Sequence, residues 1–300
     1  MKPGVIGKPL LGFGTAGLLR TGSARGRQNL LAAALANGIT HFDTAPIYGL
    51  GESERALGRF LRGERAHVTL ATKFGLRPSR MTARLAFMQR LGRRAIAVVP
   101  PLRRVLVRNS AALYTPPSFG IDEVQASLEH SLRSLRTDYL DLYLAHEASL
   151  EHCPGDDLIE LLERLRAAGK IRAFGIASSF ERAMPVLQER PALSRVVQLE
   201  SDVINNHAAR IPRDADRWLI TYGFLSGAFA AARQRVDARI DDETLGGILL
   251  RGAVLANPAG TVLMQSRSAA RIGRNVRAAY DDRHDVIVRQ IAHLTAPAAS

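Results

Sequence analysis

Eight short apolar segments alternate with helix-like segments along this chain, and the alternation is the strongest constraint on its fold. The strand-like segments are residues 9–16, 41–45, 67–74, 139–145, 171–177, 195–199, 218–224 and 261–264. Apolar residues spaced by three and four predict helices over 23–37, 52–61, 122–136, 158–168, 181–189, 244–255, 269–280 and 286–294. Residues 205–216 are polar and poorly periodic, so we expect a short or missing helix there. Such alternation is typical of parallel strands joined by crossover helices.

The number of these units favours a closed barrel over an open sheet. Eight strand–helix units in 300 residues suit an α/β protein with the (β/α)8 fold, the TIM barrel. We therefore predict one barrel domain over 1–300, with an inserted basic segment after the third strand and a C-terminal helix. The 46% hydrophobic content is enough for a large buried core.

Composition excludes several other classes of protein. No uncharged apolar run approaches the roughly 18 residues of a membrane span, and no apolar signal core precedes the first strand. The single cysteine, Cys153, excludes an intramolecular disulfide and a cysteine-rich metal site. We expect no metal site, no transmembrane segment and a cytoplasmic location.

The net charge of +13 is concentrated in one segment. Only four of the 41 basic residues are lysine, a bias typical of GC-rich coding sequences. However, residues 66–121 contain no acidic residue, and nine arginines lie between Arg77 and Arg108. This distribution indicates a local basic surface, and the scarcity of aromatic residues for base stacking argues against nucleic-acid binding.

The same segment, about 77–119, is far longer than the usual strand-to-helix connection of roughly two to six residues. It follows the third strand directly, so we expect it to rise over the mouth of the barrel. One hypothesis is a lid or docking surface that attracts an anionic substrate, an acidic carrier protein or a membrane surface. The alternative is a lineage-specific insertion whose arginines reflect codon usage.

A glycine pattern near the start of the chain resembles a dinucleotide-binding fingerprint. Residues 12–17 match G-x-G-x-x-G after a strand, and Asp43 ends the next strand. In that fingerprint the last glycine opens a helix, whereas here residues 18–22 intervene before the helical pattern begins. We therefore favour a glycine-rich first strand that packs tightly inside a barrel.

Four polar residues fall at the ends of consecutive predicted strands. Asp43 and Tyr48 flank the loop after the second strand, Lys73 ends the third strand and His146 ends the fourth. The carboxyl ends of barrel strands form the face on which such enzymes place their catalytic groups. A tyrosine with a pKa of about 10 is a poor acid, but a neighbouring lysine cation lowers that pKa. With an aspartate to hold the lysine and an imidazole to orient an oxygen, the set suits protonation of a carbonyl that receives hydride.

Longer motifs make the chain similar to a known family. Residues 38–54, 71–73, 127–146, 169–176, 197–198 and 260–263, in this order, resemble the aldo-keto reductase family over nearly the whole chain. The resemblance implies a barrel that binds NAD(P)H without a Rossmann fold and transfers hydride to an aldehyde or ketone, or in reverse from an alcohol. It also implies that Tyr48 is the general acid, Lys73 its pKa partner, Asp43 the support and His146 the residue that orients the carbonyl.

The resemblance further implies a set of cofactor contacts. Ser178 and Gln198 match the nicotinamide-carboxamide contacts, and Tyr222 matches the ring that stacks on nicotinamide. The adenosine-phosphate segment corresponds to Gln265, Ser266, Arg267, Arg271 and Asn275.

This chain departs from the family pattern at three places near the cofactor contacts. Ala177-Ser178 replaces the Ser-Asn of many members, and residues 222–227 differ from their Ser-Pro-Leu strand end. Gln265 replaces a lysine usual in NADPH-preferring members. We still favour NADP(H) over NAD(H), because Arg267 and Arg271 could supply the missing charge.

Two other functions remain open from the sequence. The barrel could bind the cofactor as a regulatory subunit or sensor, although a sensor has no need for the complete proton-transfer set. An isomerase or lyase could use the same tyrosine without net redox change. The substrate is not specified by the sequence, because barrel pockets are built from variable loops.

Overall fold

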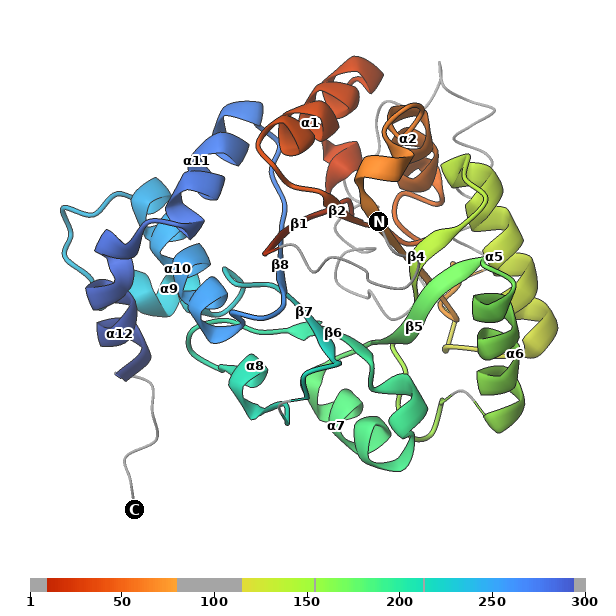
Figure 1. Ribbon diagram of the computed structural model, residues 1–300. Helices are drawn as coiled ribbons and strands as arrows, with labels where there is room; N and C mark the ends of the chain where they lie inside the picture. Colours follow the sequence, from red (N-terminus) through yellow and green to blue (C-terminus); the bar gives the residue numbers. More distant parts are fainter. Residues whose placement is uncertain (1–9, 80–114, 154, 213, 294–300) are drawn as a thin grey trace.

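The computed structural model describes residues 10–79, 115–153, 155–212 and 214–293, in which eight parallel strands close into a barrel (Figure 1). The strands are β1 (Leu11–Gly14), β2 (His41–Asp43), β3 (Thr69–Phe74), β4 (Leu140–His146), β5 (Ile171–Ala177), β6 (Val196–Glu200), β7 (Trp218–Tyr222) and β8 (Thr261–Met264). Each strand pairs with the next in chain order, and β8 pairs with β1. This topology confirms the predicted (β/α)8 fold.

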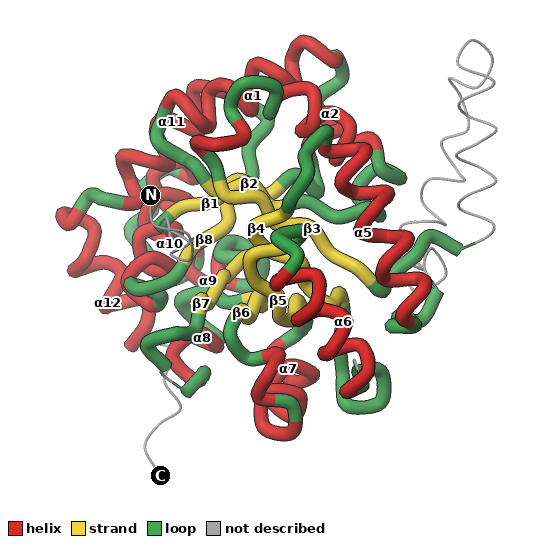
Figure 2. The backbone as a smooth tube through the Cα atoms, turned by 45° about the vertical axis from the view of Figure 1, so that its right-hand side comes forward, coloured by secondary structure: helices red, strands yellow, loops and turns green. Residues whose placement is uncertain are grey.

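Helices surround the strands, as Figure 2 shows. They are α1 (Ala24–Ala36), α2 (Glu52–Phe60), α5 (Ile121–Leu135), α6 (Asp156–Ala167), α7 (Phe180–Glu189), α8 (His207–Arg210), α9 (Ala228–Arg233), α10 (Asp242–Ala256), α11 (Ala269–Ala279) and α12 (Asp285–His293). Side-chain caps begin two of them: Ser23 accepts from the Gly26 N–H at α1, and Asp241 accepts from the Thr244 N–H at α10. The helix expected to be short, α8, has four residues.

One helix was not predicted. The helix α9 has only six residues, and its alanine-rich sequence lacks the spaced large apolar residues that mark an amphipathic helix. Its stability comes from burial of Ala228 and Ala232 against the neighbouring elements. Short helices of this kind depend on tertiary packing more than on sequence pattern.

The strand register places the polar strand ends on one side of the barrel. Lys73 pairs with Leu144, while His146 pairs with Ala177 on the next strand. Ala177 in turn pairs with Gln198 of β6. Below this layer the barrel interior is filled by side chains, among them Leu142, Ile220 and Leu263. The polar groups therefore sit on a packed floor, not above a channel.

The glycine pattern of residues 12–17 provides room for side chains of neighbouring strands. A Cβ atom on Gly12 would lie 2.6 Å from Leu263 Cδ2 and 2.8 Å from His41 Cδ2. A Cβ atom on Gly17 would lie 2.8 Å from Gln265 Oε1. These contacts, within a closed barrel, confirm the tightly packed first strand and exclude the Rossmann interpretation.

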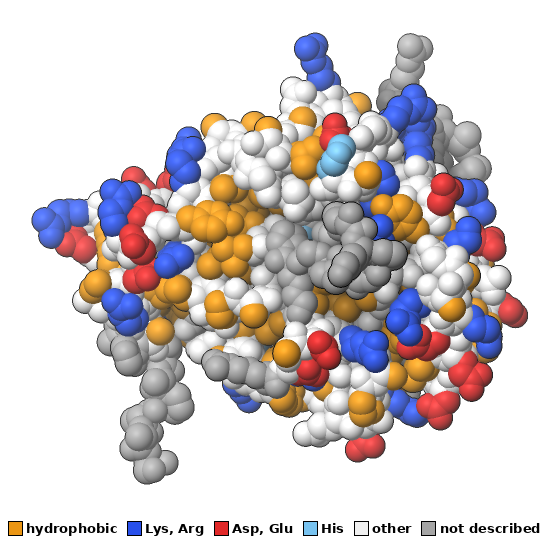
Figure 3. All heavy atoms as spheres, in the orientation of Figure 1, with side chains coloured by type: hydrophobic (Ala, Val, Ile, Leu, Met, Phe, Trp, Pro, Cys, Tyr) orange, Lys and Arg blue, Asp and Glu red, His pale blue; other side chains and the backbone are white. Residues whose placement is uncertain are grey.

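The two ends of the basic segment lie next to each other. The Thr115 N–H donates to the Arg77 carbonyl at 3.0 Å, and the Ser118 N–H donates to the Gly75 carbonyl at 3.0 Å. Residues 80–114 lie outside the described residues, and with them most of the segment to which the lid or docking hypothesis applies. On the face in Figure 3, the coloured Lys and Arg side chains are interspersed with Asp and Glu. None of the described helices has the length and apolar character needed to cross a membrane.

Candidate active site

The four predicted catalytic side chains line one cavity at the carboxyl ends of the strands. Asp43 ends β2, Lys73 is the penultimate residue of β3, His146 ends β4, and Tyr48 lies in the loop after β2. The cavity they line has a volume of about 470 Å³. The structure therefore brings together the whole group that the sequence indicated.

Lys73 and Asp43 form a buried ion pair at the base of this cavity. The Lys73 Nζ donates to both carboxylate oxygens of Asp43, at 2.7 and 2.8 Å, and to the Thr44 carbonyl at 3.1 Å. Each of the two charged residues is 2% exposed. Burial is the largest influence on the Lys73 pKa and would lower it, but attraction to Asp43 and Tyr48 outweighs burial and raises the pKa. Lys73 is therefore a cation at neutral pH.

Tyr48 lies beside both Lys73 and His146. The Lys73 Nζ is 5.2 Å from the centre of the Tyr48 ring, and the Tyr48 and His146 rings meet edge to face at 6.3 Å. Burial raises the pKa of Tyr48, the Lys73 cation lowers it, and the Asp43 carboxylate raises it again. The net direction is upward, which corrects the expected lowering: Lys73 acts as predicted, but desolvation and Asp43 outweigh it.

His146 is neutral at physiological pH. Burial, together with the nearby Lys73 cation, lowers its pKa to about 3. A neutral imidazole keeps one N–H donor and one acceptor nitrogen, so it can donate a hydrogen bond without bringing a charge into the cavity.

The residues matched to the nicotinamide contacts do not all face the cavity. Gln198 and Tyr222 line it. The Gln198 Nε2 donates to Asp43 at 3.0 Å, while its Oε1 is buried and has no hydrogen-bond partner among the described residues. Ser178 is 1% exposed, lines neither of the two cavities described here, and donates its hydroxyl to the Ala148 carbonyl at 2.7 Å.

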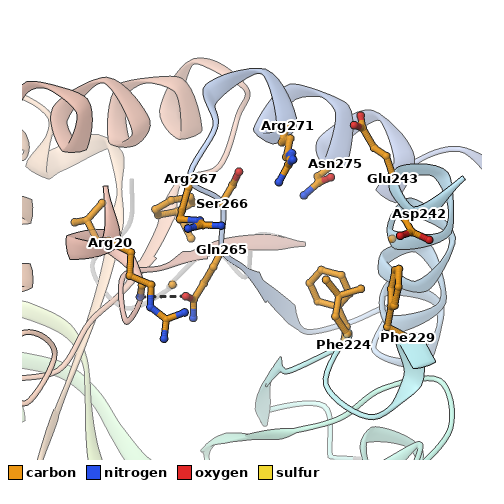
Figure 4. Close-up of a pocket in the computed structure, with 16 residues that line it drawn as sticks. Arg20, Phe224, Phe229, Asp242, Glu243, Gln265, Ser266, Arg267, Arg271 and Asn275 are labelled. Carbon is orange, nitrogen blue, oxygen red and sulfur yellow. Dashed lines mark hydrogen bonds between the residues drawn. The ribbon is translucent and has the colours of Figure 1, made fainter. Parts of the chain in front are cut away.

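A second cavity, of about 500 Å³, adjoins the first. The two cavities share four lining residues: Gly14, Phe224, Leu225 and Gln265. The second one contains the rest of the matched phosphate segment, Ser266, Arg267, Arg271 and Asn275. In Figure 4, Arg271 and Asn275 project from α11 toward Phe224 and Phe229 on the opposite wall.

Gln265 connects the two sides of this second cavity. Its Oε1 accepts a hydrogen bond from the Gly17 N–H at 3.1 Å, which links the loop after β8 to the loop after β1. The lysine usual at this position has thus been replaced by a side chain that folds back onto the glycine-rich loop. Ser266 stabilises the loop after β8, because its hydroxyl donates to the Ser268 carbonyl at 2.9 Å.

Three guanidinium groups in the second cavity form no ion pair with any carboxylate of the described residues: Arg20, Arg267 and Arg271. The two acidic residues of the cavity wall are paired with arginines that do not line it. Asp242 lies 3.7 Å from Arg233, and Glu243 pairs with Arg274. The cavity therefore carries an excess of positive charge suited to phosphate groups.

Comparison with known protein families identifies one family whose model covers most of the barrel. The model of the Aldo/keto reductase family matches residues 10–246. The chain belongs to this family. Aldo-keto reductase YhdN of Bacillus subtilis (strain 168) is 35% identical over 150 residues, which cover 49% of this chain and 35% of YhdN. Aldo-keto reductase yakc [NADP(+)] of Schizosaccharomyces pombe is 29% identical over 187 residues, covering 59% of this chain and 46% of that protein.

The chain thus matches less than half of the length of these two curated relatives. Among solved structures, the holo form of aldo-keto reductase AKR11C1 from Bacillus halodurans superposes with a TM-score of 0.75 at 20% identity. That similarity covers 98% of this chain and 94% of the other. The similarity shows that the two proteins share a fold over nearly the full length of both chains.

Sequence reasoning missed three charged residues of the second cavity: Arg20, Asp242 and Glu243. Arg20 follows β1 and faces the cavity from the side opposite α11 (Figure 4). The loop that carries Arg20 is marked in the sequence only by its glycines, and no local pattern indicates that its arginine lies near the segment after β8. Within the described residues, no group of three or more His, Cys, Asp and Glu side chains could hold a metal ion.

Proposed function

We propose that this chain is an NADP(H)-dependent oxidoreductase that interconverts an aldehyde or ketone and the corresponding alcohol, with Tyr48 as the general acid/base. The observation that carries the proposal is the adjacency of the two cavities. One holds Asp43, Tyr48, Lys73 and His146, and the other is lined by arginines that have no carboxylate partner in the described part of the chain. A proton-transfer group beside a phosphate-binding cavity is what hydride transfer from a nicotinamide nucleotide requires.

The residues present fit such a cofactor. The unpartnered buried Oε1 of Gln198 is an acceptor suited to the N–H of a carboxamide. Arg20, Arg267 and Arg271 suit phosphate oxygens, and the printed name of the fission yeast relative, yakc [NADP(+)], supports NADP(H). The residues that would hold the cofactor are Arg20, Gln198, Tyr222, Gln265, Ser266, Arg267, Arg271 and Asn275. Ser178 contributes least, because its hydroxyl is donated to a backbone carbonyl.

A nicotinamide nucleotide held by these residues would supply a hydride, two electrons with one proton, to a carbonyl carbon. Tyr48 donates its hydroxyl proton to the carbonyl oxygen, which completes the alcohol. The Lys73 cation stabilises the tyrosinate that remains, and Asp43 holds Lys73 in place. Neutral His146 orients the carbonyl by donating an N–H hydrogen bond to its oxygen. Water then returns a proton to Tyr48.

The raised pKa of Tyr48 means that the residue is protonated at neutral pH, the state that carbonyl reduction needs. Oxidation of an alcohol needs the tyrosinate, so it should become favourable only as the pH rises. At neutral pH Tyr48 is therefore in the protonation state that reduction uses.

Tyr48→Phe tests the proposal most directly. Removing the hydroxyl should lower kcat for benzaldehyde reduction by about 10²- to 10⁴-fold, the usual contribution of a general acid. NADPH binding, followed by quenching of protein fluorescence, serves as the control and should be retained. Full activity in Tyr48→Phe would refute the role of Tyr48. Tight NADPH binding by a wild-type protein that reduces no carbonyl would favour the sensor instead.

The hypothesis of an acidic partner concerns residues 77–119, of which 80–114 lie outside the described part of the chain.

A further inference from the structure

A carboxylate stands next to the catalytic histidine. Glu147 follows His146 directly, and its side chain lines the catalytic cavity. Its backbone has φ 58°, the left-handed region that side chains other than glycine rarely adopt. The Glu147 N–H donates to the Ala177 carbonyl at 2.7 Å, which holds this conformation in place. Strained residues of this kind cluster at functional sites, where the strain aims a side chain.

The Glu147 carboxylate is partly paired on its outer side. Arg182, in α7, donates from Nη1 to Glu147 Oε2 at 3.0 Å. The side chains are 55% exposed for Arg182 and 34% exposed for Glu147. Arg182 does not line the cavity, so its charge faces water while the carboxylate faces both the cavity and the arginine. Solvent strongly screens the attraction within an exposed pair of this type. Arg182 therefore neutralises only part of the negative charge that Glu147 presents to the cavity.

Glu147 decides the sign of the charge on the cavity wall. The ionisable side chains of the described wall that carry a charge at neutral pH are Asp43, Lys73 and Glu147. Asp43 and Lys73 are paired at 2.7 Å and largely cancel. Glu200 adds to the negative side, because its Oε1 would lie 2.7 Å from a Cβ atom on Gly223, a residue of the same wall.

Both tyrosines of the cavity respond to this carboxylate. Burial is the main cause of the raised pKa of Tyr222, and Glu147 is the next contributor. Glu147 also acts to raise the pKa of Tyr48. The carboxylate is therefore close enough to act electrostatically where a substrate carbonyl would bind.

We propose that Glu147 is a specificity-determining residue, which favours carbonyl substrates carrying a positive charge and disfavours substrates carrying a carboxylate. This inference rests on the proposed reductase function. A unit charge on the wall of a partly desolvated cavity discriminates between substrates of opposite sign without a hydrogen bond to either. The preference is opposite to the one expected if arginines of the 77–119 segment steered anionic substrates into the site.

Three aldehydes that share one ring test the inference. Benzaldehyde is neutral, 4-carboxybenzaldehyde is an anion, and 4-(trimethylammonio)benzaldehyde is a cation. With NADPH as the reductant, wild-type protein should show the highest kcat/KM for the cation and the lowest for the anion. Glu147→Gln should lower the cation-to-anion ratio by about tenfold, mainly through KM, which is the size expected for one partly screened charge. Added salt should reduce the wild-type ratio and change the variant ratio less.

Two further variants separate a charge effect from a structural one. Arg182→Gln removes the partner of Glu147, so it should raise the cation-to-anion ratio above that of wild type. Glu151→Gln removes the same charge from the same loop at a residue that does not line the cavity, with a side chain that is 86% exposed, and should leave the ratio unchanged. A purely structural role for Glu147 would change the rates of all three aldehydes alike and leave the ratio intact.

The outcomes are distinct. An equal ratio in wild type and Glu147→Gln, or a wild-type preference for the anion, would overturn the charge preference while leaving the reductase function standing. A wild-type protein that reduces none of the three aldehydes would contradict the reductase function itself, and the inference would fall with it.

Discussion

The two adjoining cavities share four wall residues yet carry opposite charge. The second cavity, the proposed nucleotide cavity, presents Arg20, Arg267 and Arg271 with no ionic partner among the described residues. Its acidic residues are paired with arginines that do not line it. In the described wall of the catalytic cavity, the cation Lys73 is paired with Asp43, and the carboxylate of Glu147 is retained. A polyanionic cofactor and a substrate of a different charge can therefore be recognised side by side.

The difference also shows how charge is used at two levels of burial. In the nucleotide cavity the guanidinium groups remain available to a ligand, so each should act mainly on affinity. In the catalytic cavity the ion pair is buried and hydrogen bonded on both sides, so it should act on chemistry and on stability together. Removing one charge from each cavity should therefore give effects of different kinds.

The largest effect is expected from Lys73→Met. This change removes the cation that stabilises the tyrosinate and leaves Asp43 buried without its ionic partner. We expect kcat to fall by at least about 10³-fold, and the free energy of unfolding to fall by about 3–5 kcal/mol, as is usual when half of a buried ion pair is removed. Steady-state kinetics and urea denaturation measure the two effects. Wild-type stability in this variant would show that the pair is not a buried, mutually dependent unit.

The opposite cavity is tested by Arg271→Gln. Loss of one charge-assisted contact should weaken NADPH binding by roughly tenfold to a hundredfold, while leaving stability and the kcat at saturating NADPH near wild type. Fluorescence titration with NADPH and NADH separately provides the measurement, and NADH binding should change less. Arg277→Gln, on the same helix but not lining the cavity, is the matched control. Equal loss for both nucleotides would place Arg271 on a phosphate that the two share.

A more gradual effect, spread over several pH units, is expected from pH. Burial lowers the pKa of His41 to about 4 and that of His146 to about 3, both from an ordinary value of 6.5. Between pH 6.5 and 4 the unfolded chain binds protons that the folded chain does not, so stability should fall as the pH falls. The slope should be about 1 kcal/mol per pH unit for each histidine, measurable by urea denaturation. His67→Asn is the control. The side chain of His67 is 70% exposed, so this change should leave the slope of stability against pH as in wild type.

The dependence of kcat on pH provides a separate test of the direction in which the Tyr48 pKa is shifted. Reduction needs protonated Tyr48, whose pKa is raised, so kcat should be flat through neutral pH and fall only in the alkaline range. An inflection near pH 6.5 would instead indicate that His146 titrates during turnover, contrary to its neutral state in the cavity.

Much of the site could be predicted from sequence because its residues follow strands. Asp43, Lys73 and His146 each stand at the carboxyl end of a segment whose apolar pattern is unambiguous, and parallel strands bring such ends together. Arg20 and Glu147 could not be recognised in this way. Arg20 lies in a short 3-10 turn and reaches its cavity through the closure of β1 against β8, while the role of Glu147 depends on a left-handed backbone.

The direction in which the Tyr48 pKa is shifted likewise could not be predicted from the sequence. The sequence identifies the lysine that lowers it, but the balance against burial and Asp43 depends on distances and exposure.

The sequence by itself determined the barrel and placed the tyrosine, lysine, aspartate and histidine near the ends of its strands. Both depend on periodicity and on strand ends, which are local properties of the chain. The candidate phosphate segment came from the family resemblance instead. Only the tertiary structure decided which charges remain unpaired in each cavity. Pairing and desolvation arise between residues far apart in the chain, such as Glu147 and Arg182, and electrostatic energy depends on their separation in space.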